Sequence, residues 1–122
     1  RLVCASFHIP HPMAEAVYSL DRFWAGPLKA WVGYEAGQPM TTAAAVDSGG
    51  VLGIYSVATM PDFRRRGYGE AAVRHAVARL RELGAEGPVV LQSSPGAYSL
   101  YRSMGFRSRT RFYIFATTET AA

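Results

Sequence analysis

The spacing of hydrophobic residues changes from the period of a strand to the period of a helix in the middle of the chain. Residues 51–59 are rich in β-branched and aromatic side chains and predict a strand, which Pro61 ends. After Gly69 the hydrophobic residues recur at helical spacing, with Glu70 in the first turn and Gly84 at the end. This stripe consists of Ala72, Val73, Ala76, Val77, Leu80 and Leu83. The order predicts a strand, a turn and a helix.

The flanking segments carry shorter patterns of the same two kinds. They predict a strand over 2–7, a helix over 13–24, and two strands over 30–35 and 41–46 that form an antiparallel meander with 51–59. Beyond the long helix they predict a strand at 89–93, a helix at 96–104 and a final strand at 109–117. Because two strands joined by a crossover helix should be parallel, we expect a mixed sheet. The predicted class is α/β (α+β), with a mostly antiparallel central sheet flanked by helices.

The turn between the central strand and its helix has the composition of an anion site. It contains three consecutive arginines, Arg64, Arg65 and Arg66, followed by Gly67 and Gly69. A helix start leaves backbone N–H groups unpaired and carries the positive end of the helix dipole. Glycines let an anion approach the backbone closely. The turn therefore predicts a phosphate-binding site.

The spacing of the glycines separates the known phosphate turns. The chain has no Gly-Lys-Ser or Gly-Lys-Thr, so a P-loop is excluded. A dinucleotide turn would read Gly67-x-Gly69-x-x-Ala72, but the repeated strand–helix units of that fold are missing. The pattern Arg64-x-x-Gly67-x-Gly69 instead resembles the acyl-CoA pyrophosphate loop, [QR]xxGx[GA], of the GCN5-related N-acetyltransferases (GNAT).

A second motif of the same family follows downstream. The family carries a buried strand and then the pattern NxxAxxLYxxxGF, and five of its positions match here: Ala97, Leu100, Tyr101, Gly105 and Phe106. Ser94 stands where asparagine is more common in the family, and a serine there can also cap the following helix. The resemblance runs from about residue 31 to about residue 116, and it implies the GNAT acyl-CoA N-acyltransferase fold.

The resemblance implies an activity and a set of site residues. It implies an acetyl-CoA-dependent N-acyltransferase that moves an acetyl group directly to an amine, without a covalent enzyme intermediate. Tyr101 corresponds to the family tyrosine that gives a proton to the leaving thiolate, and a phenol with a pKa of about 10 suits that role. The resemblance assigns cofactor contacts to Val57, Thr59, Arg64, Arg65, Arg66, Gly67, Tyr68, Gly69 and Ser94. For Val57 and Thr59 the contact is implied for the main chain.

The general base is not identified by the sequence. Residues 51–59 contain no Asp, Glu or His, although many family members use a carboxylate on this strand. Glu35, Asp47, Asp62, His8, His11 and His75 are candidates, and none of them is assigned. Four aromatic residues, Trp24, Trp31, Tyr34 and Tyr55, could line an acceptor pocket or simply pack in the core. The acceptor itself is not predicted beyond a small-molecule or peptide amine.

Composition limits the alternatives. We interpret the 122 residues as a single domain over 1–122, which can be a piece of a longer chain. No segment has the length of a membrane span and the first residues show no export signal, so we expect a cytoplasmic protein. Cys4 is the single cysteine, and the histidines have no ligand spacing, so neither a disulfide nor a metal site is predicted. A net charge of +4 leaves an RNA-binding module as a weaker alternative, and a noncatalytic acyl-CoA-binding module is the main one. A homodimer stays open.

Overall fold

The computed structural model describes residues 26–117, and the predicted strand at 2–7 and helix at 13–24 lie outside the described residues. The elements are β1 (Lys29–Glu35), β2 (Gln38–Ser48), β3 (Val51–Thr59), η1 (Pro61–Phe63), α4 (Tyr68–Glu82), β4 (Val89–Leu91), η2 (Pro95–Ala97) and α5 (Tyr98–Ser103). By internal packing the chain divides into two compact units, Arg1–Gln92 and Ser93–Ala122. Each unit is described by itself.

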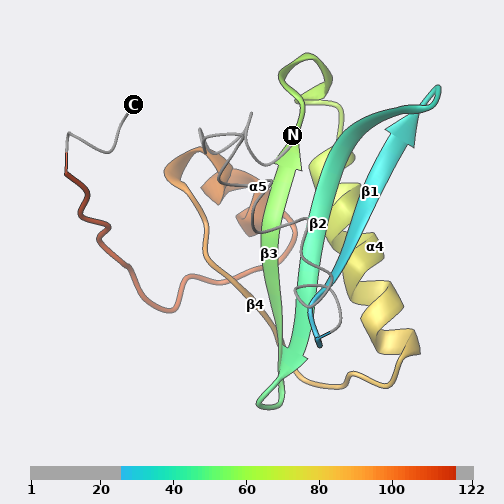
Figure 1. The fold of residues 1–122 in the computed structure, drawn as a ribbon. Coiled ribbons are helices and arrows are strands. Elements are labelled where there is room, and N and C mark those ends of the chain that lie inside the picture. Colours follow the sequence, from blue (N-terminus) through green and yellow to red (C-terminus); the bar gives the residue numbers. More distant parts are fainter. Residues whose placement is uncertain (1–25, 118–122) are drawn as a thin grey trace. The chain divides into compact units, whose positions relative to one another are not determined.

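The described part of the first unit is built on a four-stranded mixed sheet in the order β1-β2-β3-β4 (Figure 1). The strands β1, β2 and β3 form the predicted antiparallel meander, and β4 pairs with β3 in parallel. The long connection through α4 allows this parallel pairing, as expected for a strand–helix–strand unit. The mixed, mostly antiparallel sheet predicted from the sequence is therefore confirmed.

Two tight turns set the register of the meander. Ala36 and Gly37 both have positive φ, 50° and 78°, and so do Gly49 and Gly50, 60° and 81°. Two consecutive left-handed residues are the geometry of a two-residue hairpin whose twist matches its strands. The first turn is thus shorter than the gap between the predicted strands at 30–35 and 41–46, because residues 38–40 already belong to β2. The strand β2 accordingly starts earlier than predicted, whereas β1 ends at Glu35 as predicted.

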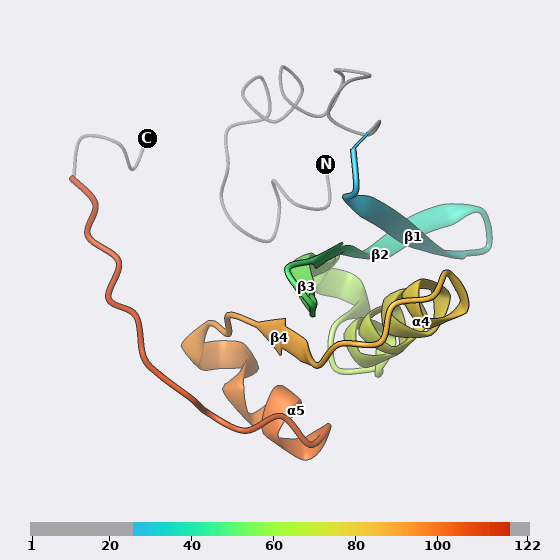
Figure 2. The ribbon, with the colours of Figure 1, turned by 90° about the horizontal axis from the view of Figure 1, so that it is seen from below.

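The helix α4 covers one face of the sheet (Figure 2). Its buried residues are Val73, Ala76 and Leu80, three members of the predicted stripe. They share this face with fully buried sheet residues such as Leu52. Burying a leucine or valine side chain contributes about 1.5–3 kcal/mol, so this stripe is a principal source of the unit's stability. Leu83 is exposed and extends past the last helical turn.

The connection from α4 to β4 is held by close backbone contacts. The Arg81 guanidinium donates through Nη1 to the carbonyls of Ala85, at 3.2 Å, and Gly87, at 2.7 Å. The Leu52 N–H donates to the Pro88 carbonyl at 2.9 Å. A Cβ atom on Gly87 would lie 1.9 Å from the Gly50 carbonyl oxygen, so only glycine fits. These contacts fix where β4 begins beside β3.

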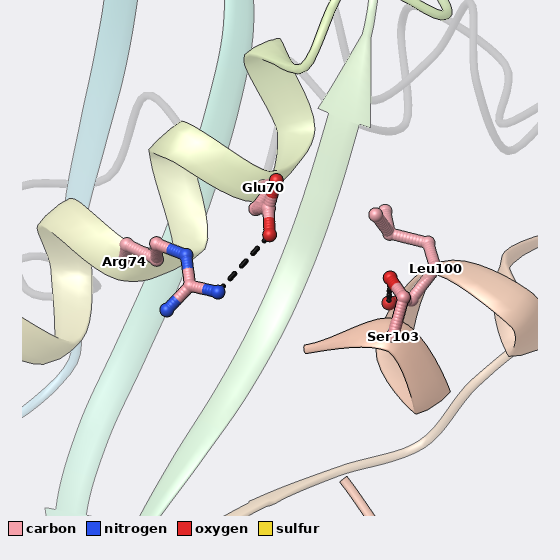
Figure 3. A network of polar contacts seen from close by, with 4 residues as sticks. All are labelled: Glu70, Arg74, Leu100 and Ser103. Atoms are coloured by element: carbon pink, nitrogen blue, oxygen red, sulfur yellow. Dashed lines mark hydrogen bonds and ion pairs between the residues drawn. The ribbon is translucent and has the colours of Figure 1, made fainter. Parts of the chain in front are cut away.

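The second unit contains η2, α5 and an extended segment. The predicted helix at 96–104 is present as η2 followed by α5, and the Ser103 hydroxyl donates to the Leu100 carbonyl at 2.6 Å within α5 (Figure 3). The predicted final strand at 109–117 is wrong, because this segment carries no strand. Its large apolar residues, Phe112, Tyr113, Ile114 and Phe115, are exposed. A strand needs a hydrogen-bonded neighbour, and strand-forming residues alone do not supply one.

Candidate active site

The central strand β3 opens away from β4 at a β-bulge. The pairing of β3 with β4 covers only Leu52–Ile54. One residue further, the register with β2 shifts, because Tyr55 pairs with Ala44 and Ala58 with Thr42. Two residues, Ser56 and Val57, therefore face one residue of β2, and Ser56 has a φ of 52°. A bulge of this kind bends a strand and re-aims its groups.

The bulge leaves Val57 outside both ladders. Among the described strands, Val57 has no pairing partner in β2 or β4. Because backbone N–H and C=O groups need partners, an open strand segment is a natural binding edge for an extended, amide-bearing ligand. The predicted position of Val57 at the cofactor arm thus falls at the point where β3 diverges from β4.

The end of β3 is fixed by two threonines. The Thr41 hydroxyl on β2 donates to the Ala58 carbonyl at 3.0 Å and lies 3.0 Å from the Thr59 hydroxyl. Since the Thr41 hydroxyl has one proton, the Thr59 hydroxyl is the donor in the second contact. The Thr59 carbonyl accepts a hydrogen bond of 3.0 Å from Nε of Arg64. The strand end and the start of the arginine turn are therefore connected directly.

The arginine–glycine turn has an unusual backbone. Arg65 and Gly67 both have left-handed φ values, 63° and 82°. Such a conformation costs a non-glycine residue about 1–2 kcal/mol and is concentrated at functional sites. A Cβ atom on Gly67 would meet no atom within 4 Å, so the space in front of this residue is open. The turn exposes its backbone rather than hiding it.

The turn leads directly into the start of α4. Gly67 is the N-cap residue, and the Ala71 N–H donates to the Gly67 carbonyl at 3.0 Å. The regular helix ladder therefore starts at Ala71, and the N–H groups of Tyr68, Gly69 and Glu70 precede it. Together with the positive end of the helix dipole, they form the donor set that a pyrophosphate requires. The residues present thus fit the phosphate end of an acyl-CoA.

Two arginine side chains of the turn make contacts with neighbouring residues of the protein. Arg64 is joined to Thr59, and the Arg66 guanidinium lies 5.6 Å from the centre of the Phe63 ring. The Phe63 ring in turn packs edge-on against Tyr68, with ring centres 6.3 Å apart. Asp62 lies exposed in η1, as expected for a turn residue. Arg64 and Arg66 therefore help to shape the turn.

An ion pair partly neutralises the acid at the helix start. Nη2 of Arg74 lies 3.0 Å from Oε1 of Glu70, one helical turn away (Figure 3). The Glu70 carboxylate interacts favourably with the positive end of the helix dipole, but it would repel a bound pyrophosphate. Arg74 offsets this repulsion, although an exposed pair of this kind adds only about 0.3–0.5 kcal/mol to stability.

In the second unit, the predicted general acid is a buried tyrosine. Tyr101 lies on α5 and is 8% exposed. Its ring packs edge-on against Phe106 at 5.8 Å between centres, and its carbonyl accepts from the Phe106 N–H at 3.0 Å. Burial raises the pKa of the Tyr101 phenol above its ordinary 10.0. The phenol is therefore protonated at neutral pH, as a proton donor must be.

Ser94 does not act as the predicted helix cap. It is the N-cap residue of η2, but its side chain makes no capping hydrogen bond. Its carbonyl accepts from the Ala97 N–H at 3.1 Å and from the Ser93 hydroxyl at 2.8 Å. The backbone of Ser94 thus starts the turn, and its side chain does not fill the capping role considered from the sequence.

The candidate bases lie on exposed positions. Glu35, Asp47, Asp62 and His75 are exposed, and His8 and His11 lie outside the described residues. Within residues 26–117, no group of three or more His, Cys, Asp or Glu side chains could hold a metal ion. In the same residues, no helix combines the length and the apolar character needed to cross a bilayer.

Two of the four aromatic residues considered for an acceptor pocket, Trp31 and Tyr55, lie on different faces of the sheet. Trp31 lies 6.2 Å from the His75 ring of α4, edge to face, and so belongs to the covered face of the sheet. Tyr34 and Tyr55 are exposed, at 63% and 52%. Trp24 lies outside the described residues.

Sequence reasoning missed the bulge at Ser56, since a serine in a strand carries no signal for it.

Comparisons with known proteins agree with this geometry. The family model described as Acetyltransferase (GNAT) family matches residues 2–106. This match defines the class of protein as an N-acetyltransferase. The chain belongs to the GNAT family. No curated protein matches it.

Solved structures share the fold. An acetyltransferase from Trypanosoma brucei has a TM-score of 0.71 and 21% identity, covering 95% of this chain and 88% of its own. Glucosamine-6-phosphate N-acetyltransferase from Arabidopsis thaliana has a TM-score of 0.62 and 16% identity, covering 86% and 74%. AAC(6')-Iy in complex with a bisubstrate analogue, CoA-S-monomethyl-acetylneamine, has a TM-score of 0.64 and 17% identity, covering 87% and 76%. At these identities the likeness shows the fold alone.

Proposed function

We propose that the protein transfers an acetyl group from acetyl-CoA directly to the nitrogen of an amine. The observation that carries this proposal is the continuity of the open strand edge at Val57, the strand end at Thr59 and the left-handed turn that starts α4. An acyl-CoA has the matching parts, since a pyrophosphate follows an amide-bearing arm. The CoA-based ligand of AAC(6')-Iy supports this cosubstrate for the fold.

The proposed cosubstrate contacts use mainly the backbone. The pyrophosphate accepts hydrogen bonds from the N–H groups of the turn and of the first residues of α4. The arm pairs with β3 at Val57, where the bulge interrupts the regular ladder. The main chain of Thr59, Arg64–Gly69 and Ser94 completes the predicted contacts, and none of these contacts needs a particular side-chain charge.

The proposed reaction makes one bond and breaks one. The neutral amine attacks the thioester carbonyl, the C–N bond forms, and the C–S bond breaks as the tetrahedral intermediate collapses. Tyr101 gives its proton to the leaving thiolate, and the proton lost by the amine restores the phenol through solvent. Burial raises the pKa of the Tyr101 phenol, so the donor is protonated at neutral pH. The acyl group passes directly between substrates.

The test is a substitution that removes only the proton donor. We expect Tyr101→Phe to fold normally and to bind acetyl-CoA with unchanged affinity, because the ring still packs against Phe106. We expect acetyl transfer to fall by about 10²-fold, the typical contribution of general acid catalysis. Thiol release in the presence of an amine panel measures transfer, and calorimetry measures binding. Unchanged transfer by this variant would rule out the assigned acid.

The absence of Asp, Glu and His from β3 favours a second candidate, a noncatalytic acyl-CoA-binding module. In that case the wild-type chain binds acetyl-CoA and acetylates no amine in the panel. The same assay with the wild-type chain therefore separates the two functions.

A further inference from the structure

The ring of Tyr55 lies across Gly53 on β3. A Cβ atom on Gly53 would lie 2.7 Å from Cε2 of Tyr55 and 2.9 Å from its hydroxyl oxygen. Gly53 is buried, whereas Tyr55 is 52% exposed. A glycine inside a strand often marks a close approach of another group, and here the group is this ring. The ring position is therefore set by the missing side chain at residue 53.

Tyr55 belongs to the sheet face opposite α4. Paired residues of neighbouring strands share a face, and faces alternate along each strand. The Trp31–His75 contact places Trp31 on the face that α4 covers. Tyr55 pairs with Ala44, which is one residue from Ala43, the partner of Trp31, and so it lies on the other face.

This face carries no charged side chain from the described strands near Tyr55. The register places on it Val32, Thr42, Ala44, Val46, Gly53 and Val90. Thr42 is the one polar member of this set, and its hydroxyl donates to the Trp31 carbonyl at 2.9 Å. Thr42, Ala44 and Gly53 are buried, whereas Val32 and Val90 are exposed, so the accessible part of this face near Tyr55 is apolar and carries no carboxylate from the described strands.

Tyr55 also lies close to the opening of β3. It precedes the bulge residue Ser56 directly and Val57 by two residues, which is about 7 Å along a strand. In the proposed function the acyl arm lies at Val57 and approaches from the start of α4. An acceptor that meets the acyl group from the other face passes the exposed half of the Tyr55 ring.

We propose that Tyr55 determines acceptor specificity by packing its ring against an apolar or aromatic body that carries the reacting amine. This inference rests on the proposed function. Gly53 is the positioning residue, because it permits the ring to lie flat along the strand. The contact is made by the ring, so the hydroxyl of Tyr55 is dispensable.

The test compares two amines, phenethylamine and spermidine, in a steady-state acetyl transfer assay with the full chain. We expect the wild-type chain to prefer phenethylamine. Tyr55→Ala should raise the KM for phenethylamine by about 10-fold with little change in kcat, because a 10-fold change corresponds to the loss of one aromatic contact. Gly53→Ala should also raise this KM, because the new methyl group displaces the ring. Tyr55→Phe should keep the wild-type preference, and the KM for acetyl-CoA should stay constant throughout.

Matched controls come from the same unit. Tyr34→Ala removes another exposed tyrosine, on β1, and Gly26→Ala adds a methyl group where nothing lies within 4 Å. Neither should change the preference. A wild-type preference for spermidine, or an unchanged preference in Tyr55→Ala, overturns the inference. A wild-type chain that binds acetyl-CoA and acetylates neither amine contradicts the proposed function instead.

Discussion

Gly67 is the residue of the turn whose backbone conformation most clearly favours glycine. Its φ of 82° lies in the region that residues with a Cβ atom rarely adopt, and the space around it is open. Gly69 differs, because its φ is not left-handed and a Cβ atom there would touch only the Thr59 hydroxyl, at an ordinary 3.6 Å. Of the two glycines in the motif, Gly67 is therefore the one that the turn requires for its conformation.

We expect Gly67→Val to weaken acetyl-CoA binding by about 10-fold or more. A β-branched residue is strained at positive φ, by about 1–2 kcal/mol, and its side chain would enter the space in front of the turn. Arg65→Ala should weaken binding only a few-fold, because an exposed charge is screened by solvent. Isothermal titration with acetyl-CoA measures both.

Gly26→Val is the control for the glycine substitution, since a Cβ atom on Gly26 would meet no atom within 4 Å and the residue lies outside the turn. It should bind like the wild-type chain. If Arg65→Ala weakened binding more than Gly67→Val, side-chain charge rather than the backbone would dominate recognition.

Among the elements, β3 and α4 could be predicted closely because their patterns are long and periodic. The strand occupies the predicted residues 51–59, and the helix starts one residue before the predicted Gly69. Shorter elements were predicted less well. The strand at 89–93 is reduced to Val89–Leu91, because its pairing with β3 stops where the bulge begins.

The predicted strand at 109–117 shows what sequence pattern cannot supply. Residues 112–115 are strong strand formers, yet strand structure also depends on a neighbouring ladder that propensity does not determine. The bulge at Ser56 could not be predicted for the same reason, since a bulge is defined by how β3 pairs with β2. The interior Gly53, by contrast, is a signal in the sequence for a close approach such as that of the Tyr55 ring.

The close approach of Gly87 to Gly50, beside the start of β4, can be tested for its contribution to stability. We expect Gly87→Ala to destabilise the protein by roughly 1–3 kcal/mol, because a Cβ atom 1.9 Å from the Gly50 carbonyl forces the backbone apart. Urea unfolding followed by circular dichroism measures the free energy of unfolding. Gly26→Ala should change it little, and equal stability of the two variants would show that this close approach is not required.

At the scale of the whole molecule, charge gives a weak guide to function. The net charge of +4 is compatible with either RNA or CoA as a phosphate partner. The structure turns Arg64 and Arg66 toward Thr59 and Phe63, so two of the basic residues are engaged within the protein. The family, read from two motifs, could be predicted from the sequence alone, whereas the acceptor could not.

Acetyl-CoA should stabilise the folded chain. A ligand at about 100 times its Kd adds about 2.7 kcal/mol to the free energy of unfolding. For a chain of this size that corresponds to a rise in Tm of roughly 10 °C. Differential scanning fluorimetry measures it, with adenosine as a control that lacks the pyrophosphate. Steep salt-dependent binding of an RNA oligonucleotide that CoA does not displace would instead favour the RNA-binding alternative.

The hydrogen bond from Arg64 to Thr59 has a consequence for the motif itself. The family pattern accepts either glutamine or arginine at this position, although one is neutral and the other charged. Here the position works through Nε, which donates to the last carbonyl of β3. A glutamine amide can also donate a hydrogen bond, but it carries no charge. We infer that the first residue of the motif acts by fastening the turn to the sheet, a role that either side chain can fill.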